Sequence, residues 1–159
     1  MKALLSWIKD FVDVDVDVHT LCDKLVGIGF EVEEVIYLGE NLENVVTGRI
    51  EKIDRHPDAD KLIVCQINVG DEMLQIVTGA NNVSVGDIVP VAKHGSKLPN
   101  GMSIKKGKLR GVESFGMLCS GEELCITDDN YPGAEVYGIL ILDKDTPVGV
   151  DINPVIGLD

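Results

Sequence analysis

Apolar residues recur at helical spacing in two stretches near the start of the chain, residues 6–11 and 18–28. Asp17 precedes the second stretch and is a favourable N-cap. Residues 30–38 then alternate between apolar and polar side chains, which indicates a strand. These elements predict a helix–helix–strand unit over residues 1–38, with too few apolar residues to be stable alone.

Between the two helices, residues 12–18 alternate strictly between valine and aspartate. The aspartates, Asp13, Asp15 and Asp17, have the spacing of the first three ligands of an EF-hand calcium loop. The sixth loop position would then be Val18 where glycine is required, and the twelfth would be Lys24 where a bidentate glutamate is required. We therefore expect an extended segment with buried valines and no calcium site.

Beyond residue 39 the pattern changes to short apolar runs separated by turn residues. Gly70-Asp71, for example, lies between two alternating runs and indicates a hairpin. Strands at this spacing are typical of a small β barrel or sandwich, so the predicted class is mainly β with an α+β start. The expected strands cover residues 45–54, 62–69, 73–77, 88–92, 104–109, 114–118 and 138–142.

Charge is distributed unevenly along the 159 residues, whose net charge is −13. From Lys93 to Val112 the sequence contains six cations and no carboxylate. Lysine and arginine concentrated between short apolar runs favour a surface that meets phosphates. The alternative is a pair of strands with a solvated, charged outer face. The acidic remainder would repel a polyanion, so modest and steeply salt-dependent affinity is expected.

Other chemistry has weak support in the sequence. Cys119 with His94 could form a nucleophile and base, but neither an electropositive pocket nor an oriented base is visible, so we expect no catalytic residue. Cys119 and Cys125 lack a zinc-site spacing, so no metal is expected and reduced core cysteines are favoured. With no signal-peptide core and no apolar run of membrane-spanning length, the predicted location is the cytoplasm, away from membranes.

Three segments together resemble one family. They are His56-Pro57-Asp58-Ala59-Asp60-Lys61-Leu62, Thr78-Gly79-Ala80-Asn81-Asn82 and Arg110-Gly111-Val112-Glu113-Ser114-Phe115-Gly116-Met117-Leu118-Cys119-Ser120. They are similar to landmarks of the tRNA-binding OB-fold domain shared by several aminoacyl-tRNA synthetases. The start of the chain, with Trp7-Ile8 and Gly29-Phe30-Glu31-Val32-Glu33, narrows the resemblance to the bacterial phenylalanyl-tRNA synthetase β subunit.

The resemblance implies a five-stranded OB-fold barrel and a chain that is an N-terminal fragment of a longer subunit. Residues 1–38 would be half of a split domain, residues 39–150 the tRNA-binding domain, and residues 151–159 the start of the missing second half. The family enzyme is an α2β2, class II ligase that uses ATP and magnesium. Its catalytic and editing regions would be absent here, so we expect no ligase activity and no cofactor in this fragment.

The expected partners are tRNA, the synthetase α subunit and the remainder of the β subunit. The alternative hypothesis is a structural or assembly module with little tRNA affinity, which the net charge favours. Because aromatic residues are only 4% of the chain, base stacking should be minor and backbone contacts should dominate. The expected tRNA-binding residues are Arg49, Lys52, Lys61, Lys93, Lys97, Lys105, Lys106, Lys108, Arg110, Ser114 and Met117. For Ser114 and Met117, a role in barrel closure is the alternative.

Overall fold

The computed structural model describes residues 5–9, 13–29, 32 and 42–158. The chain divides into two compact units, Met1–Ile36 and Tyr37–Asp159. Within the described residues, no helix has both the length and the apolar composition needed to cross a bilayer.

The first unit contains two short helices, α1 (Leu5–Lys9) and α2 (Val18–Gly27). The Asp17 carboxylate accepts the backbone N–H of Thr20 at 2.9 Å, which confirms the predicted N-cap. This hydrogen bond is the main reason that the pKa of Asp17 lies below its usual value. The predicted strand over residues 30–38 lies, apart from Val32, outside the described residues.

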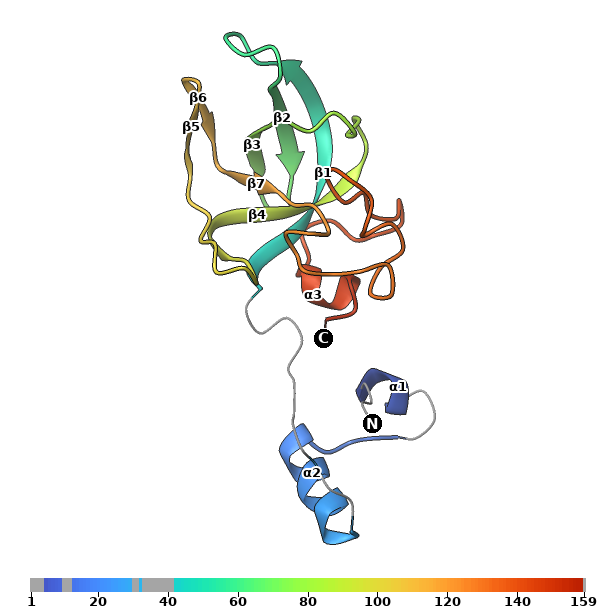
Figure 1. The fold of residues 1–159 in the computed structure, drawn as a ribbon. Coiled ribbons are helices and arrows are strands. Elements are labelled where there is room, and N and C mark those ends of the chain that lie inside the picture. The colour runs from blue at the N-terminus through green and yellow to red at the C-terminus, as the bar shows by residue number, and fades with distance from the viewer. Residues whose placement is uncertain (1–4, 10–12, 30–31, 33–41, 159) are drawn as a thin grey trace. The chain divides into compact units, whose positions relative to one another are not determined.

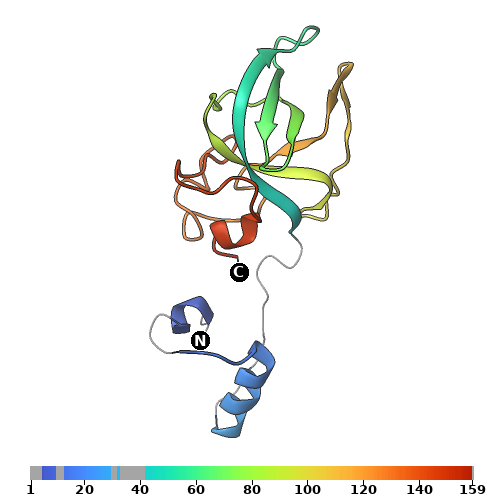
Figure 2. The ribbon, with the colours of Figure 1, turned by 180° about the vertical axis from the view of Figure 1, so that it is seen from behind.

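The second unit is built on an antiparallel sheet in which β1, the longest strand, pairs with both β2 and β4. The sheet order is β3-β2-β1-β4-β7, and β5 and β6 form a separate hairpin. The elements are β1 (Glu43–Arg55), β2 (Ile63–Asn68), β3 (Met73–Thr78), β4 (Ile88–Lys97), β5 (Gly107–Leu109), β6 (Val112–Ser114), β7 (Gly116–Leu118) and α3 (Ile152–Val155). Figures 1 and 2 show the sheet curled on itself, with the β1–β2 turn and the β5–β6 hairpin projecting from the same end.

The curled sheet closes where β6 and β7 lie against β3. Phe115, between β6 and β7, donates its backbone N–H to the Gln75 carbonyl in β3 at 2.8 Å. Gly48 in β1 permits the tight curvature, because a Cβ there would lie 2.6 Å from Ile67 and 2.7 Å from Val91. The result is the five-stranded barrel of an OB-fold, which confirms the predicted mainly-β class.

Two apolar clusters form the core of this unit. One fills the barrel and includes Ile50, Ile67 and Ile76, all fully buried. The other lies under the β1–β4 side and includes Ile152 and Ile156 from the C-terminal segment. Asp151 caps α3 by accepting the Asn153 N–H at 2.8 Å, so residues 151–158 pack with the barrel. The assignment of residues 151–159 to the second half of a split domain stays a prediction.

Three of the expected strands are wrong in detail. The run 114–118 is divided at Phe115, because its N–H turns to β3 while β7 pairs with β4. The run 138–142 forms only isolated bridges, at Ile139 and Leu142. There the Asn82 side chain occupies both backbone groups of Ile139, accepting its N–H at 3.1 Å and donating to its carbonyl at 2.9 Å. The expected strand 104–109 is shorter, beginning at Gly107.

Candidate nucleic-acid interface

Two of the expected RNA-binding cations in β1 are paired with neighbouring carboxylates. The Arg49 guanidinium lies 2.8 Å from a Glu51 carboxylate oxygen, and the Lys52 amine lies 3.5 Å from Asp54. Hydrogen bonding to Arg49 also holds the pKa of Glu51 below its usual value, so the acid is ionised beside it. These pairs are exposed and weak, but they lower the positive potential that β1 presents to a polyanion.

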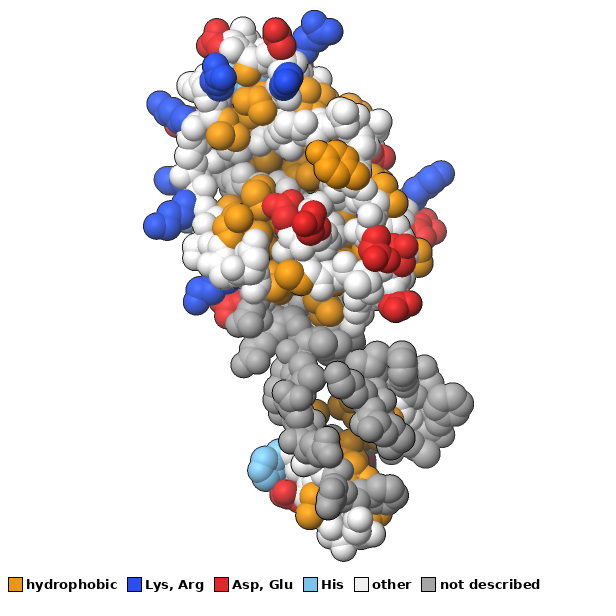
Figure 3. Space-filling model, viewed as in Figure 1, with side chains coloured by type: hydrophobic (Ala, Val, Ile, Leu, Met, Phe, Trp, Pro, Cys, Tyr) orange, Lys and Arg blue, Asp and Glu red, His pale blue; other side chains and the backbone are white. Residues whose placement is uncertain are grey.

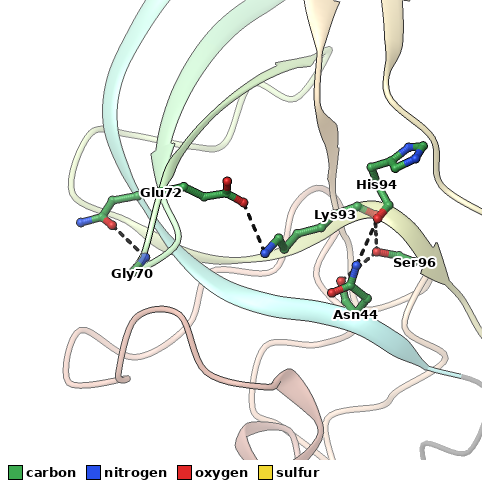
Figure 4. A network of polar contacts seen from close by, with 7 residues as sticks. Asn44, Gly70, Glu72, Lys93, His94 and Ser96 are labelled. Atoms are coloured by element: carbon green, nitrogen blue, oxygen red, sulfur yellow. Dashed lines mark hydrogen bonds and ion pairs between the residues drawn. The ribbon is translucent and has the colours of Figure 1, made fainter.

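Lys93 in β4 is also paired. Its amine lies 3.4 Å from a carboxylate oxygen of Glu72 in the β2–β3 turn (Figure 4). The Lys93 side chain is only 25% exposed. Beside it, the buried Ser96 hydroxyl lies within hydrogen-bond distance of two carbonyl oxygens, those of Lys93 and Asn44, either of which can accept its one proton. The Asn44 amide donates to the His94 carbonyl at 3.1 Å. Lys93 thus belongs to a polar network that fixes β4 against the start of β1.

The remaining expected cations are exposed, and within the described part of the chain they form no ion pair. Four of them lie in or next to the β5–β6 hairpin. We call residues 105–114 the basic arm. Lys97 lies at the end of β4, and Lys61 lies in the β1–β2 turn. The six are Lys61, Lys97, Lys105, Lys106, Lys108 and Arg110.

The tip of the basic arm is a two-residue turn with an unusual residue. Leu109 pairs with Val112, and Arg110 and Gly111 between them have φ of 51° and 86°. Two successive positive φ values are typical of a type I′ turn, which favours Asn-Gly or Gly-Gly. Arginine in this left-handed conformation is sterically unfavourable, so the position carries an exposed cation at a cost in stability.

One carboxylate does lie on the basic arm. Glu113 in β6 is directly opposite Lys108 in the hairpin register, and both residues are exposed. Side chains of directly opposite residues lie on the same face of a ribbon. Glu113 therefore reduces the positive potential on the face of the arm that presents Lys108.

Two histidines hold the basic arm against the barrel. The Nδ1 atom of His94 accepts the backbone N–H of Lys106 at 3.0 Å. The ring of His56, which is 5% exposed, contacts the Leu109 carbonyl with Nε2 at 2.8 Å. Sequence reasoning missed both residues, because isolated histidines give no signal; only the position of His56 before Pro57, in a turn, points to a structural role.

Ser114 and Met117 lie at the barrel closure. Ser114 is 5% exposed; its hydroxyl accepts the Val77 N–H and donates to the Gly116 carbonyl, both at 3.0 Å. Met117 is half-buried against the apolar cluster that contains Ile152 and Ile156. These contacts support the structural alternative for both residues; they leave little of the Ser114 side chain for a ligand, whereas Met117 is only partly buried.

The cysteines have the environment of core residues. Cys119 and Cys65 are fully buried, and burial raises the pKa of Cys65 to about 11 and that of Cys119 further. A thiol so disfavoured as thiolate is a poor nucleophile. In the described residues, no three histidine, cysteine or acidic side chains are grouped so that they could hold a metal ion.

The charges are segregated on the molecular surface. In Figure 3, basic side chains follow the edge formed by the β5–β6 hairpin, acidic side chains gather over the C-terminal segments, and both kinds lie at the projecting end of the barrel. A polyanion would be attracted to the cationic edge and repelled by the acidic region.

The sequence of this chain is similar to those of several known proteins. The chain is 54% identical over its full length to the phenylalanine–tRNA ligase beta subunit of Clostridium acetobutylicum. It is 52% identical to that of Clostridium tetani, again over its full length, and 44% identical over 99% of its length to that of Syntrophus aciditrophicus. The chain spans about one fifth of the length of these curated relatives.

These identities confirm the resemblance to phenylalanine–tRNA ligase beta subunits. A family model described as "Putative tRNA binding domain" matches residues 45–151. The match covers the barrel from β1 through the N-cap of α3, including the basic arm and the β1–β2 turn. On this match over most of its length, the chain belongs to the tRNA-binding domain family.

Proposed function

We propose that the barrel is the tRNA-binding module of a phenylalanine–tRNA ligase β subunit, and that the basic arm binds RNA phosphates. The observation that carries the proposal is the division of the cations. Among the described residues, four cations of the basic arm are exposed and form no ion pair: Lys105, Lys106, Lys108 and Arg110. By contrast, each of Arg49, Lys52 and Lys93 has a carboxylate partner. The unpaired group releases counterions most readily on binding.

In this proposal the module supports a larger reaction without performing it. The complete enzyme would be an α2β2 class II synthetase that joins phenylalanine to its tRNA with ATP and magnesium, in the cytoplasm. The α subunit and the rest of β would supply the catalytic and editing sites. The barrel contributes affinity that does not depend on base identity, because phosphate contacts carry no sequence information.

The test is fluorescence anisotropy of labelled tRNA with this chain across a salt series. If about five phosphates are neutralised, affinity should fall on the order of a hundredfold between about 50 and 200 mM salt. A triple variant, Lys105→Glu, Lys106→Glu and Lys108→Glu, should abolish this binding for every tRNA alike. The control changes Lys9, Lys24 and Lys144 to Glu, which alters the net charge equally and leaves the arm intact.

Comparison of the two triple variants separates the effect of charge on the basic arm from the effect of total net charge. Equal loss in both triple variants would assign the effect to total charge and contradict a site on the arm. Selective loss for one tRNA would contradict phosphate recognition.

A second proposal, an assembly module, is favoured by one surface feature. Val136 and Tyr137 are 67% and 94% exposed within the acidic C-terminal region. An exposed aromatic side chain among carboxylates suits docking on a basic protein surface better than contact with RNA. Absence of tRNA binding at low salt, together with weaker assembly of the complete ligase when Tyr137 is changed to Ser, would favour this function.

A further inference from the structure

We propose that His56 is a positioning residue for RNA binding, which fixes the tip of the basic arm relative to the β1–β2 turn. The inference rests on the proposed function. In this inference His56 itself contacts no phosphate. It determines where Lys61 in the β1–β2 turn lies relative to the cations at the tip of the basic arm.

The His56 imidazole joins two segments that are far apart in the chain. Its Nε2 atom lies 2.8 Å from the carbonyl oxygen of Leu109, 53 residues away. Its Nδ1 atom lies 3.0 Å from the backbone nitrogen of Asp58. Because a carbonyl only accepts and a backbone N–H only donates, both contacts require the neutral ring with its proton on Nε2.

On one side of this ring lies the β1–β2 turn. The turn is closed by backbone hydrogen bonds from His56 to the Leu62 carbonyl at 3.2 Å and from Leu62 to the Ala59 carbonyl at 3.3 Å. Lys61, exposed and unpaired among the described residues, lies within this closed turn. The Lys61 backbone is therefore fixed relative to the imidazole.

On the other side lies the tip of the basic arm. Leu109, whose carbonyl the imidazole contacts, is flanked directly by Lys108 and Arg110. The hairpin has only three residue pairs, too few for stability without tertiary contacts. Side chains hold it at three further points: the Gln75 amide donates to the Glu113 carbonyl at 2.8 Å, His94 accepts the Lys106 N–H at 3.0 Å, and the Ser114 hydroxyl accepts the Val77 N–H at 3.0 Å. Of these contacts, only that of His56 reaches the end of β5 next to the turn.

Fixing the arm in advance should increase affinity. A loose hairpin must be ordered when it binds, and the lost conformational freedom weakens the complex. Because His56 is buried, its replacement has no direct effect on the charge offered to RNA. Any loss of affinity would then report the position of the arm.

Two substitutions separate the two hydrogen bonds of the ring. In His56→Asn the short side chain can still accept the Asp58 N–H, as in an Asx-turn, but cannot reach Leu109. In His56→Gln the amide can still donate to Leu109, but the acceptor for Asp58 is lost. The same tRNA titration at low salt, with amide hydrogen exchange over residues 107–114, measures both effects on the complete 159-residue chain.

We expect H56N to weaken tRNA binding roughly three- to tenfold and to accelerate exchange in the arm while β1 and β2 stay protected. We expect H56Q to bind within about twofold of wild type. Unchanged affinity in H56N, or equal losses in both variants with faster exchange throughout the barrel, would overturn the inference while wild-type binding remained. Absence of wild-type binding would overturn the proposed function, and this inference with it.

Discussion

The Ser114 hydroxyl oxygen lies 3.0 Å from the backbone nitrogen of Val77 and accepts its proton, across a sequence separation of 37 residues. The same hydroxyl donates to the Gly116 carbonyl at 3.0 Å. One small side chain thus pairs a backbone group of β3 with one at the start of β7, at the point where the barrel closes. A buried N–H must find a partner, and here a side chain supplies it.

Ser114→Ala should destabilise the fold by about 1–3 kcal/mol, because the Val77 N–H is left buried without an acceptor. Urea unfolding followed by circular dichroism measures the change. Ser103→Ala, at an exposed position, is the matched control and should leave the midpoint unchanged. Unchanged stability in the Ser114 variant would mean that water replaces the hydroxyl, and that closure depends on the backbone contacts alone.

Arg110→Asn should stabilise the chain and weaken RNA binding at the same time. Asparagine tolerates the left-handed conformation better than arginine, so a gain of about 0.5–1 kcal/mol in the free energy of unfolding is expected. Loss of an exposed cation should lower the slope of affinity against salt by about one. Thermal unfolding measures the expected gain in stability, and the tRNA titration measures the expected loss of affinity. A variant that is less stable would contradict the interpretation of the turn.

Glu113→Gln should raise the affinity for tRNA roughly twofold to threefold at low salt, because a carboxylate opposite Lys108 is removed from the arm. The gain should shrink as salt is added. Glu122→Gln, an exposed site outside the arm, makes the same change in net charge and serves as the control. Equal gains from both variants would show that total charge, and not its position, governs binding.

The four cysteines should divide by burial in alkylation with iodoacetamide. Cys125 is exposed and Cys22 half-buried, whereas Cys65 and Cys119 are buried. We expect two adducts per chain under native conditions near neutral pH and four in denaturant, counted by mass spectrometry. Rapid native modification of Cys119 would contradict its burial and reopen the hypothesis of a nucleophilic thiol.

The raised pKa of Cys65 also predicts a loss of stability in alkaline solution. In the unfolded chain the thiol ionises near its ordinary value of 9.0, but in the fold only near 11. Between these values the unfolded state binds fewer protons, so the free energy of unfolding falls as the pH rises. Denaturant titrations from about pH 8 to 11 should show this fall. It should be smaller in Cys65→Ser at the same pH values, since that variant lacks the thiol.

The sequence by itself determined the class of fold and most of its elements, because those depend on local patterns. Alternating runs predicted β1, β2 and β3; Gly70-Asp71 predicted the hairpin between the last two; Asp17 predicted a cap that the structure confirms. The sequence also showed where cations are concentrated along the chain, because the order of charged residues does not depend on how the chain folds. The strand expected over 138–142 failed because the Asn82 side chain, 57 residues from Ile139, takes the backbone groups that a strand would have used.

Only the tertiary structure decided which of the described cations are paired with carboxylates and which contacts hold the basic arm in place. Lys93 and Glu72 are 21 positions apart in the sequence, and their pairing follows from the strand register. The contact of His56 with Leu109 likewise depends on barrel closure, which brings the β1–β2 turn to the hairpin. Contacts of this kind are absent from local sequence, because a side chain's partner is fixed by the path of the whole chain and by the need to pair every buried polar group.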